Sequence, residues 1–257
     1  MTSNNSTPAA ELQGRMLLFE QPELLSPETH SALGLAKIDR PFDFAVKATA
    51  IPLTIGELST AQKSYPIVFA GLDDPVPLAI TSIIEPINLF VDEMGQWDPM
   101  HYVPAYARCY PFALASGPDN QMAVVIDRAA PMISDTPLQA FFEGEQLSAG
   151  TQTLVDFCTN YEQDRKRTEY FSRKLKELDI LAPQQARQQP TGQEEQAVAD
   201  YFAVDTAKFQ ALDKEVVTEL FESGILALIH AHLFSLENWT RLMVRRGLQN
   251  QTDSAVA

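Results

Sequence analysis

The chain has 257 residues, of which 34 are acidic and 19 basic, so its formal net charge is −15 and its isoelectric point is about 4.6. A chain of this length buries a core that needs no disulfide or metal for stability. The acidity argues against nucleic-acid binding and against docking on anionic lipid, because both need cationic patches.

Cysteine content and the amino terminus indicate the compartment. The two cysteines, Cys109 and Cys158, are far apart in the sequence, which predicts two free thiols in a reducing environment rather than a disulfide framework or a metal site. The start of the chain is polar and has no apolar core of a signal peptide, and no run approaches the ~18 apolar residues of a membrane span. We expect a cytoplasmic protein without a transmembrane segment, and the alternative is export to the cell surface by a route without a signal.

The first half of the sequence is rich in short strand patterns separated by Gly, Pro and Asp turns. Strands are predicted at residues 16–19, 42–53, 65–70, 77–84 and 122–127. Thr54 and Glu57 have the spacing of a capping box, which predicts a helix from Thr54 to about Lys63. Short strands in this arrangement favour an antiparallel meander over alternating βαβ units.

The second half is mainly helical. Helical spacing of apolar residues predicts helices at 151–178, 214–223 and 225–246, with a polar loop at 183–190 and one strand at 198–204. Asp205 and Gly224 are positioned as helix caps. The sequence therefore predicts an α+β fold: a single domain over 15–248, β-rich from 15 to 135 and helical from 148 to 247, with a disordered start (1–14) and tail (249–257).

Unusual residues concentrate in the central stretch, residues 88–115. It reads as a buried strand at 88–92, a turn at 93–96, and a short helix that begins near Pro104 and ends at Pro111. Two interpretations stay open: an aromatic core that holds the molecular shape, or a pocket lined by polar side chains. The candidate ligand-binding residues are Asp92, Trp97, His101, Tyr102, Arg108 and Tyr110.

Catalytic and metal motifs find little support. His230 and His232 resemble half of a cupin metal motif, but on a helix residues two apart point about 200° apart and cannot chelate one ion. A satisfied polar role for His232 or Ser235 in a helix interface is the favoured interpretation. Cys109 has no obvious base beside it, and His101 would reach it only through the fold. Phosphate-loop, dinucleotide and GxSxG motifs do not occur. We expect no catalytic residue, no metal and no cofactor.

Five segments, in this order, resemble the SapC family of bacterial proteins: YPIVF (65–69), NLFVDEMGQW (88–97), YVPAYARCYPF (102–112), LKELDIL (175–181) and GILALIHAHLFSLENWTRL (224–242). The similarity runs from about residue 20 to 245, and YVPAYARCYPF is its most specific part. The resemblance implies a role in a paracrystalline surface layer (S-layer). It also implies a link to flavin-dependent halogenase-like proteins or outer-membrane receptors. It assigns no catalytic residues.

Two functional hypotheses follow. The first is a non-catalytic structural or accessory protein that acts through contact with a protein partner or through self-association, and it predicts an exposed apolar patch. The second is a small-molecule or peptide-binding protein, or an enzyme, with a pocket around Trp97, His101, Tyr102 and Arg108.

Overall fold

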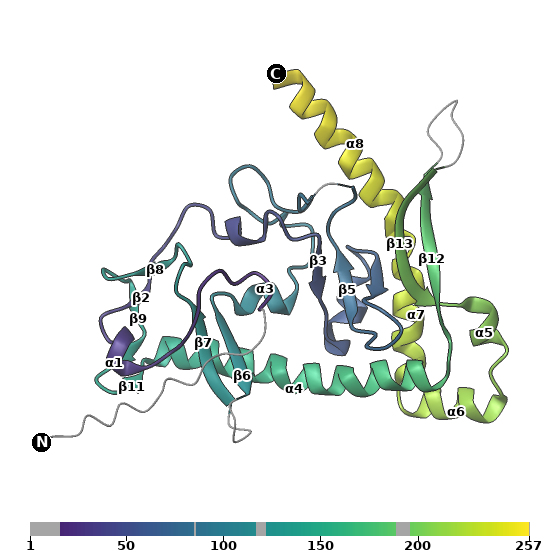
Figure 1. Cartoon of the computed structure of the whole chain (residues 1–257), viewed down its shortest axis with the longest axis horizontal. Coiled ribbons are helices and arrows are strands. Elements are labelled where there is room, and N and C mark those ends of the chain that lie inside the picture. Colours follow the sequence, from purple (N-terminus) through teal and green to yellow (C-terminus); the bar gives the residue numbers. More distant parts are fainter. Residues whose placement is uncertain (1–15, 85, 117–121, 189–195, 257) are drawn as a thin grey trace, which may run out of the picture. The chain divides into compact units, whose positions relative to one another are not determined.

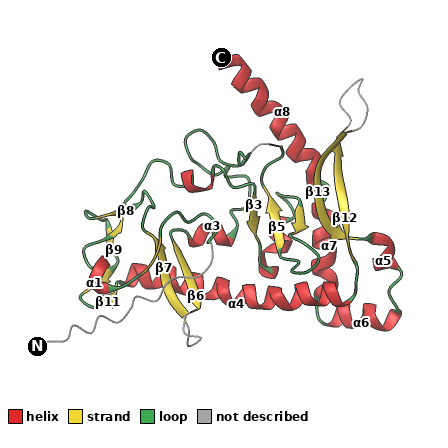
Figure 2. Ribbon diagram, in the orientation of Figure 1, coloured by secondary structure: helices red, strands yellow, loops and turns green. Residues whose placement is uncertain are grey.

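A computed structural model describes residues 16–84, 86–116, 122–188 and 196–256, with side chains described as far as Gly247. Antiparallel sheets come mostly from the first half of the chain and helices mostly from the second (Figure 2). The α+β fold class predicted from the sequence is confirmed. The predicted disordered start, 1–14, lies outside the described residues.

Contacts within the chain divide it into two compact units, each built from two segments. Unit 1 comprises residues 1–38 and 109–159, and unit 2 comprises residues 39–108 and 160–257. The division falls within two helices, α3 (Ala105–Cys109) and α4 (Ala149–Glu177). The single domain that the sequence predicts over 15–248 thus contains two separate sets of packed elements.

Unit 1 is built on short antiparallel strands. One sheet has the order β1 (Pro22–Leu24), β7 (Met122–Asp127), β6 (Phe112–Ser116), and a second has the order β8 (Ile133–Ser134), β2 (Gly34–Leu35), β9 (Gln139–Ala140) (Figure 1). A two-stranded pair, β10 (Phe142–Glu143) with β11 (Gln146–Leu147), and a one-turn helix, α1 (Pro27–His30), complete it. The strand predicted at 122–127 is confirmed.

The strand predicted at 16–19 is wrong, since pairing begins only at Pro22. Leu18 has a φ of 70°, which breaks an extended run. The backbone amides of Glu20 and Gln21 then donate to the buried Asp127 carboxylate, at 3.0 and 2.8 Å, instead of to a neighbouring strand.

Unit 2 contains a five-stranded antiparallel sheet. Its order is β12 (Leu181–Gln188), β13 (Gln196–Val204), β4 (Ile67–Phe69), β5 (Pro77–Ile80), β3 (Ala50–Pro52). The strands predicted at 65–70 and 198–204 are present, and the one predicted at 77–84 ends already at Ile80. Phe69 of the central strand contacts Phe171 of α4 and His232 of α7 (Ile225–Ser235), with ring centroids 6.3 and 4.8 Å apart. These contacts are part of the core of unit 2.

Two predictions for this sheet are corrected. Of the strand predicted at 42–53 only 50–52 pairs; the preceding residues form a 3₁₀ turn, η1 (Asp43–Ala45). The carbonyls of Ala45 and Ala48 accept from the side chains of Asn88 and Thr81, so they are not available for a ladder. Of the loop predicted at 183–190, residues 183–188 belong instead to strand β12, at the edge of the sheet, and residues 189 and 190 lie outside the described residues. Backbone pairing with β13 forms it despite its polar composition, and a register shift follows Ala186.

The remaining helices are η2 (Ile55–Glu57), α2 (Leu58–Ala61), α5 (Thr206–Gln210), α6 (Lys214–Glu222), α7 and α8 (Asn238–Val256). Helix α6 lies close to the bounds predicted at 214–223, and η2 with α2 covers most of the helix predicted from Thr54 to about Lys63. Helix α5 was not predicted. Asp205 caps α5 by accepting from the amides of Ala207 and Lys208, and Gly224 separates α6 from α7 with a φ of 77°.

The helix predicted at 225–246 is two helices, because the chain turns at Leu236 and Glu237 between α7 and α8. Helix α8 continues to Val256, so the backbone of 249–256 is helical where the sequence predicts a tail; no Gly or Pro interrupts it there. No single helix of the described chain has the length and apolarity to cross a membrane, and α6 meets the test only jointly with residues 225–247, across a bend of 93°.

Candidate functional site

The rings of the central stretch form part of the core of unit 2. Trp97 is only 5% exposed, and its indole N–H donates to the Tyr65 hydroxyl at 3.2 Å. The Tyr65 hydroxyl in turn donates to the carbonyl of Tyr102. Phe42 and Phe90 pack edge-on against Trp97 and Tyr65, with centroids 5.6 and 4.6 Å apart. Trp97, a predicted ligand-binding residue, is therefore a packing residue here.

The backbone in front of Trp97 is a turn rather than the strand predicted at 88–92. The Asn88 side chain accepts from the Phe90 amide and bends the chain, so that pairing is limited to one bridge between Val91 and Trp97. The turn predicted at 93–96 is present, and Gly95 adopts the positive φ (66°) that it requires.

Three ionisable side chains meet at the surface of this core. Arg245, from α8, donates through Nε to the carbonyl of Leu89 at 2.5 Å and through Nη2 to Oδ2 of Asp98. Its Nη1 lies 3.1 Å from Nε2 of His101, and its guanidinium lies over the Phe90 ring, 4.6 Å from the centroid. Arg245 therefore uses all three of its nitrogens to tie α8 to the central stretch.

Electrostatics set the charge state of this cluster. Burial opposes ionisation of Asp98, but hydrogen bonds from Arg245 and from the Met100 amide outweigh it, so the pKa of Asp98 is lowered. Burial, and then the positive charge of Arg245, lower the pKa of His101. At neutral pH Asp98 is ionised and His101 is neutral. Because Arg245 donates to Nε2 of His101, the imidazole proton is assigned to Nδ1, a buried atom without a hydrogen-bond partner among the described residues.

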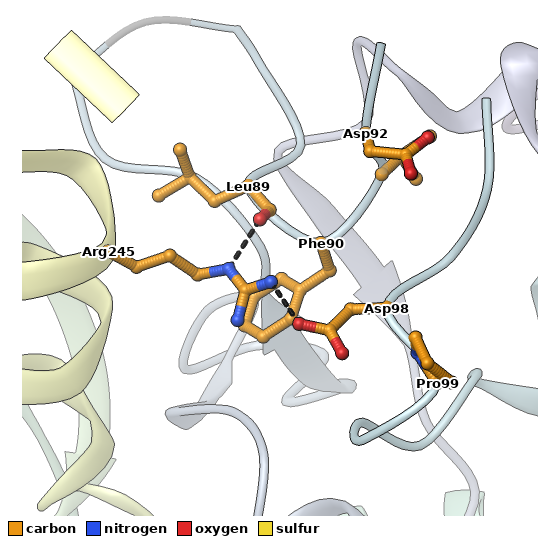
Figure 3. Close-up of a pocket in the computed structure, with 7 residues that line it drawn as sticks. Leu89, Phe90, Asp92, Asp98, Pro99 and Arg245 are labelled. Carbon is orange, nitrogen blue, oxygen red and sulfur yellow. Dashed lines mark hydrogen bonds and ion pairs between the residues drawn. The ribbon is translucent and has the colours of Figure 1, made fainter. Parts of the chain in front are cut away.

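A hollow of about 450 Å³ lies beside the cluster (Figure 3). It is lined by Leu89, Phe90, Val91, Asp92, Asp98, Pro99 and Arg245. The Arg245 side chain extends over the Phe90 ring and reaches both Leu89 and Asp98. The Asp92 carboxylate lies apart from the Arg245–Asp98 ion pair. Asp98 and Arg245 neutralise each other, and His101 is not among the lining residues. The lining of the hollow therefore combines an ion pair, an aromatic ring and the separate carboxylate of Asp92.

Tyr102 and Arg108 belong to a different network, centred on the buried carboxylate of Glu57. Glu57 is 6% exposed and accepts from the Thr54 amide and hydroxyl, both at 2.9 Å, from the Ala105 amide at 2.6 Å and from the Tyr102 hydroxyl at 3.1 Å. Arg108 donates to the Tyr102 hydroxyl at 2.8 Å. The capping-box carboxylate thus also holds the start of α3. The structure does not bring Tyr102 and Arg108 to the hollow.

The last candidate from the central stretch, Tyr110, lies in unit 1. Its hydroxyl donates to Asp127 at 2.9 Å, and its ring packs edge-on against Phe19 at 5.5 Å. Cys109 and Cys158 are both buried and reduced. Of the predicted ligand-binding residues, only Asp92 lines the hollow, and only His101 belongs to the ion cluster beside it.

Helix α7 places the two histidines of the supposed metal motif in different environments. His232 is fully buried: Nδ1 donates to the Ile67 carbonyl at 2.8 Å and Nε2 accepts from the Val204 amide at 3.1 Å. Burial lowers its pKa to about 4, against the opposing effect of the hydrogen bond to Ile67. The structural role favoured for His232 is confirmed. The described part of the chain contains no group of three or more His, Cys, Asp or Glu placed to hold a metal ion.

A second hollow, here called the α6–α7 groove, has an apolar rim. It measures about 480 Å³ and is lined by Ser59, Gln62, Phe221, Gly224, Leu226, Ala227, His230, Ala231 and Phe234. Phe221 of α6 and Phe234 of α7 are 73% and 64% exposed. The signal for it in the sequence is that α7 is apolar on almost every side, which is more than one buried face requires.

Sequence reasoning missed Arg245 as a site residue, because it lies 147 residues from Asp98 and nothing local marks it. Comparison with known proteins gives one finding: the SapC family model matches residues 25–242. No curated protein and no solved structure matches the chain.

Proposed function

The chain belongs to the SapC family, and we propose that it is a non-catalytic structural or accessory protein that works through protein–protein contact, with a second copy of itself as partner. The α6–α7 groove is the observation that carries this proposal. Monomeric proteins rarely expose large apolar patches that have no binding role. Here two exposed phenylalanine rings line an apolar hollow.

Burial of the exposed side chains of the groove would supply a free energy of the size expected for one part of an interface. Burying a phenylalanine side chain contributes roughly 1.5–3 kcal/mol. Phe221 and Phe234 together would supply the centre of a contact, and a stable interface buries about 800 Å² on each partner. In a two-fold dimer each copy would offer the same rings and the same groove to the other.

The charge of the chain predicts how such a contact responds to salt. Among the described residues that line the groove there is no aspartate, glutamate, lysine or arginine, so the contact breaks no ion pair. The net charge of −15 makes two copies repel each other at a distance. Added salt screens that repulsion, and association should strengthen as salt rises, the opposite of an interface built on ion pairs.

Sedimentation equilibrium tests the proposal directly. We expect a concentration-dependent dimer that is more stable in about 500 mM than in about 50 mM NaCl. The double variant Phe221→Asp, Phe234→Asp should be a monomer of unchanged circular dichroism. The matched controls are Met100→Asp and Leu138→Asp, which place the same charge at side chains 86% and 81% exposed that are not among the lining residues of the groove, and should leave the dimer intact. A wild-type monomer at every concentration and salt level would overturn the proposal.

From the family resemblance we further propose that the protein acts in a bacterial surface layer. Its other partners would be flavin-dependent halogenase-like proteins or outer-membrane receptors. Biotin labelling of intact cells with a membrane-impermeant reagent tests the location. Labelled protein would support a location at the cell surface, and labelling only after lysis would place the protein inside the cell, where self-association remains to be tested as above.

A second candidate function is favoured by the hollow in Figure 3, where an ion pair and the Phe90 ring share one wall. This geometry supports a small-molecule or peptide-binding site that offers both signs of charge. Titration with N-acetylglycine and with glycinamide, followed by the amide spectra of residues 89–99, tests it. Saturable shifts that disappear in Arg245→Ala or in Asp92→Asn would support binding, and unchanged spectra with both probes would exclude it.

A further inference from the structure

A third cavity of about 210 Å³ lies in unit 2, apart from the residues of the α6–α7 groove, and is here called the tyrosine pocket. Its lining includes apolar side chains, Leu53 just after β3 and Val76 from the loop before β5. Tyr106 of α3 and Tyr161 of α4 contribute aromatic rings, with centroids 5.9 Å apart and planes inclined by 58°.

The walls of the tyrosine pocket are held in place by hydrogen bonds behind them. The Ser172 hydroxyl of α4 donates to the Pro75 carbonyl at 2.6 Å and fixes the loop next to Val76. The Thr168 hydroxyl accepts from the Ile55 amide at 2.9 Å, just beyond β3. Both hydroxyl-bearing residues are about 4% exposed. A cavity built on a long helix and pinned in this way is formed before any ligand arrives.

Charged groups stand at the rim, and carboxylates are in excess. Arg165 donates to Glu162 at 2.8 Å and to Glu169 at 2.5 Å, so two carboxylates already satisfy its charge. Asp74 also lines the pocket; its side chain is exposed, and no described residue pairs with it. The rim therefore has a net negative charge with one carboxylate uncommitted, which disfavours an anion and favours a cation.

We propose that the tyrosine pocket binds a cationic group, ammonium or guanidinium, carried on a short apolar stem. The rings of Tyr106 and Tyr161 offer π faces to the cation, the uncommitted carboxylate of Asp74 offers charge, and Leu53 and Val76 contact the stem. The volume is smaller than the ~300–1,000 Å³ of sites for drug-sized ligands, so one side-chain-sized group fills it. This site is independent of the proposed self-association.

Amide-spectrum titration of the full chain with N-acetyl-arginine amide tests the proposal, and N-acetyl-citrulline amide is the uncharged match. We expect saturable shifts of amides around residues 53, 76 and 161–172 with arginine only. Butylguanidinium distinguishes the source of the cation. Equal affinity for it indicates a free small cation, and much weaker binding indicates a side chain presented on a peptide. Either result is compatible with the proposed chemistry.

Variants separate the contributions of charge and rings. Asp74→Asn should weaken binding of the arginine probe about fivefold, the usual size of one partly exposed charge pair. Asp135→Asn, an equal charge change at an exposed residue of unit 1, should have no effect. Tyr106→Leu should weaken binding about two- to fivefold. Equal shifts with the citrulline probe, no saturable shift with arginine, or an Asp74→Asn protein that binds like wild type would overturn the proposal.

Discussion

Arg245 and Asp98 lie 147 residues apart in the sequence and form an ion pair at the surface of the unit 2 core. The same guanidinium donates to the Leu89 carbonyl and covers the Phe90 ring. One side chain of α8 thus contacts the backbone, a ring and a carboxylate of the central stretch.

Replacing Arg245 by alanine should destabilise the protein by about 2 kcal/mol, because a hydrogen bond to the Leu89 carbonyl, a cation–π contact and a partly exposed ion pair are lost together. A double-mutant cycle with Asp98→Asn should give a coupling energy of about 1 kcal/mol by urea unfolding. Arg173→Ala, which removes an exposed arginine of α4, is the control and should stay within about 0.5 kcal/mol of wild type. A coupling energy of zero would show that the pair contributes no stability.

Glu57→Gln should destabilise the protein by about 2–4 kcal/mol, since an amide cannot accept from four donors and its own NH₂ would face some of them. Burial, and next the Glu57 charge, raise the pKa of Tyr102 to about 12. Removing that charge should lower the pKa of Tyr102 in an ultraviolet titration. The exposed exchange Glu93→Gln should change neither quantity. An unchanged Tyr102 titration in folded Glu57→Gln protein would contradict the proposed network.

His232 should make stability fall on acidification. Its folded-state pKa of about 4 lies below the unfolded value near 6.5, so between these values the unfolded chain binds a proton that the folded chain does not. The contribution is fully present above pH 6.5 and is lost as pH falls to about 4; it amounts to about 3 kcal/mol. Urea unfolding at several pH values should show this slope reduced in His232→Gln and retained in His230→Gln. An equal slope in both variants would assign it to other groups.

Gly34→Ala should cost about 2–4 kcal/mol, because the new Cβ would lie 2.1 Å from the Gln139 carbonyl oxygen of β9. Gly71→Ala is its match, since a Cβ there meets no atom within 4 Å and the residue has no positive φ; it should be neutral or stabilising by up to ~1 kcal/mol. Thermal unfolding of the two variants gives the comparison. Equal stability would mean that β2 and β9 separate easily.

Local patterns in the sequence predicted the elements that local chemistry determines. The capping box at Thr54 and Glu57, the strand at 122–127, the long helix of residues 149–177 and the stop at Gly224 all depend on residues next to each other in the chain. Strand β12 was missed because its evidence is a partner strand, not its own composition. Residues 88–92 resemble a strand, but the Asn88 side chain bonds the nearby backbone and turns the chain.

The candidate site was predictable only in part. The sequence singled out the stretch, and the structure places Asp92 at the hollow and His101 in the ion cluster. The sequence could not show which polar side chains lie close together. Trp97 hydrogen-bonds to Tyr65, Tyr102 to Glu57 and Tyr110 to Asp127, and each pair is far apart in the chain. Contacts between residues so far apart in the chain leave no regular spacing in the sequence from which they could be predicted.

Strand β12 is an edge strand of the unit 2 sheet, and the unpaired backbone groups of an edge strand can pair with a strand of another chain. Pro183 has no N–H to offer, and the register shift after Ala186 interrupts the regular spacing of the bonds that remain. Both features disfavour the pairing of further strands with this edge of the sheet. Two copies that pair through helices α6 and α7 about a two-fold axis would form a closed dimer by this contact, not a fibril.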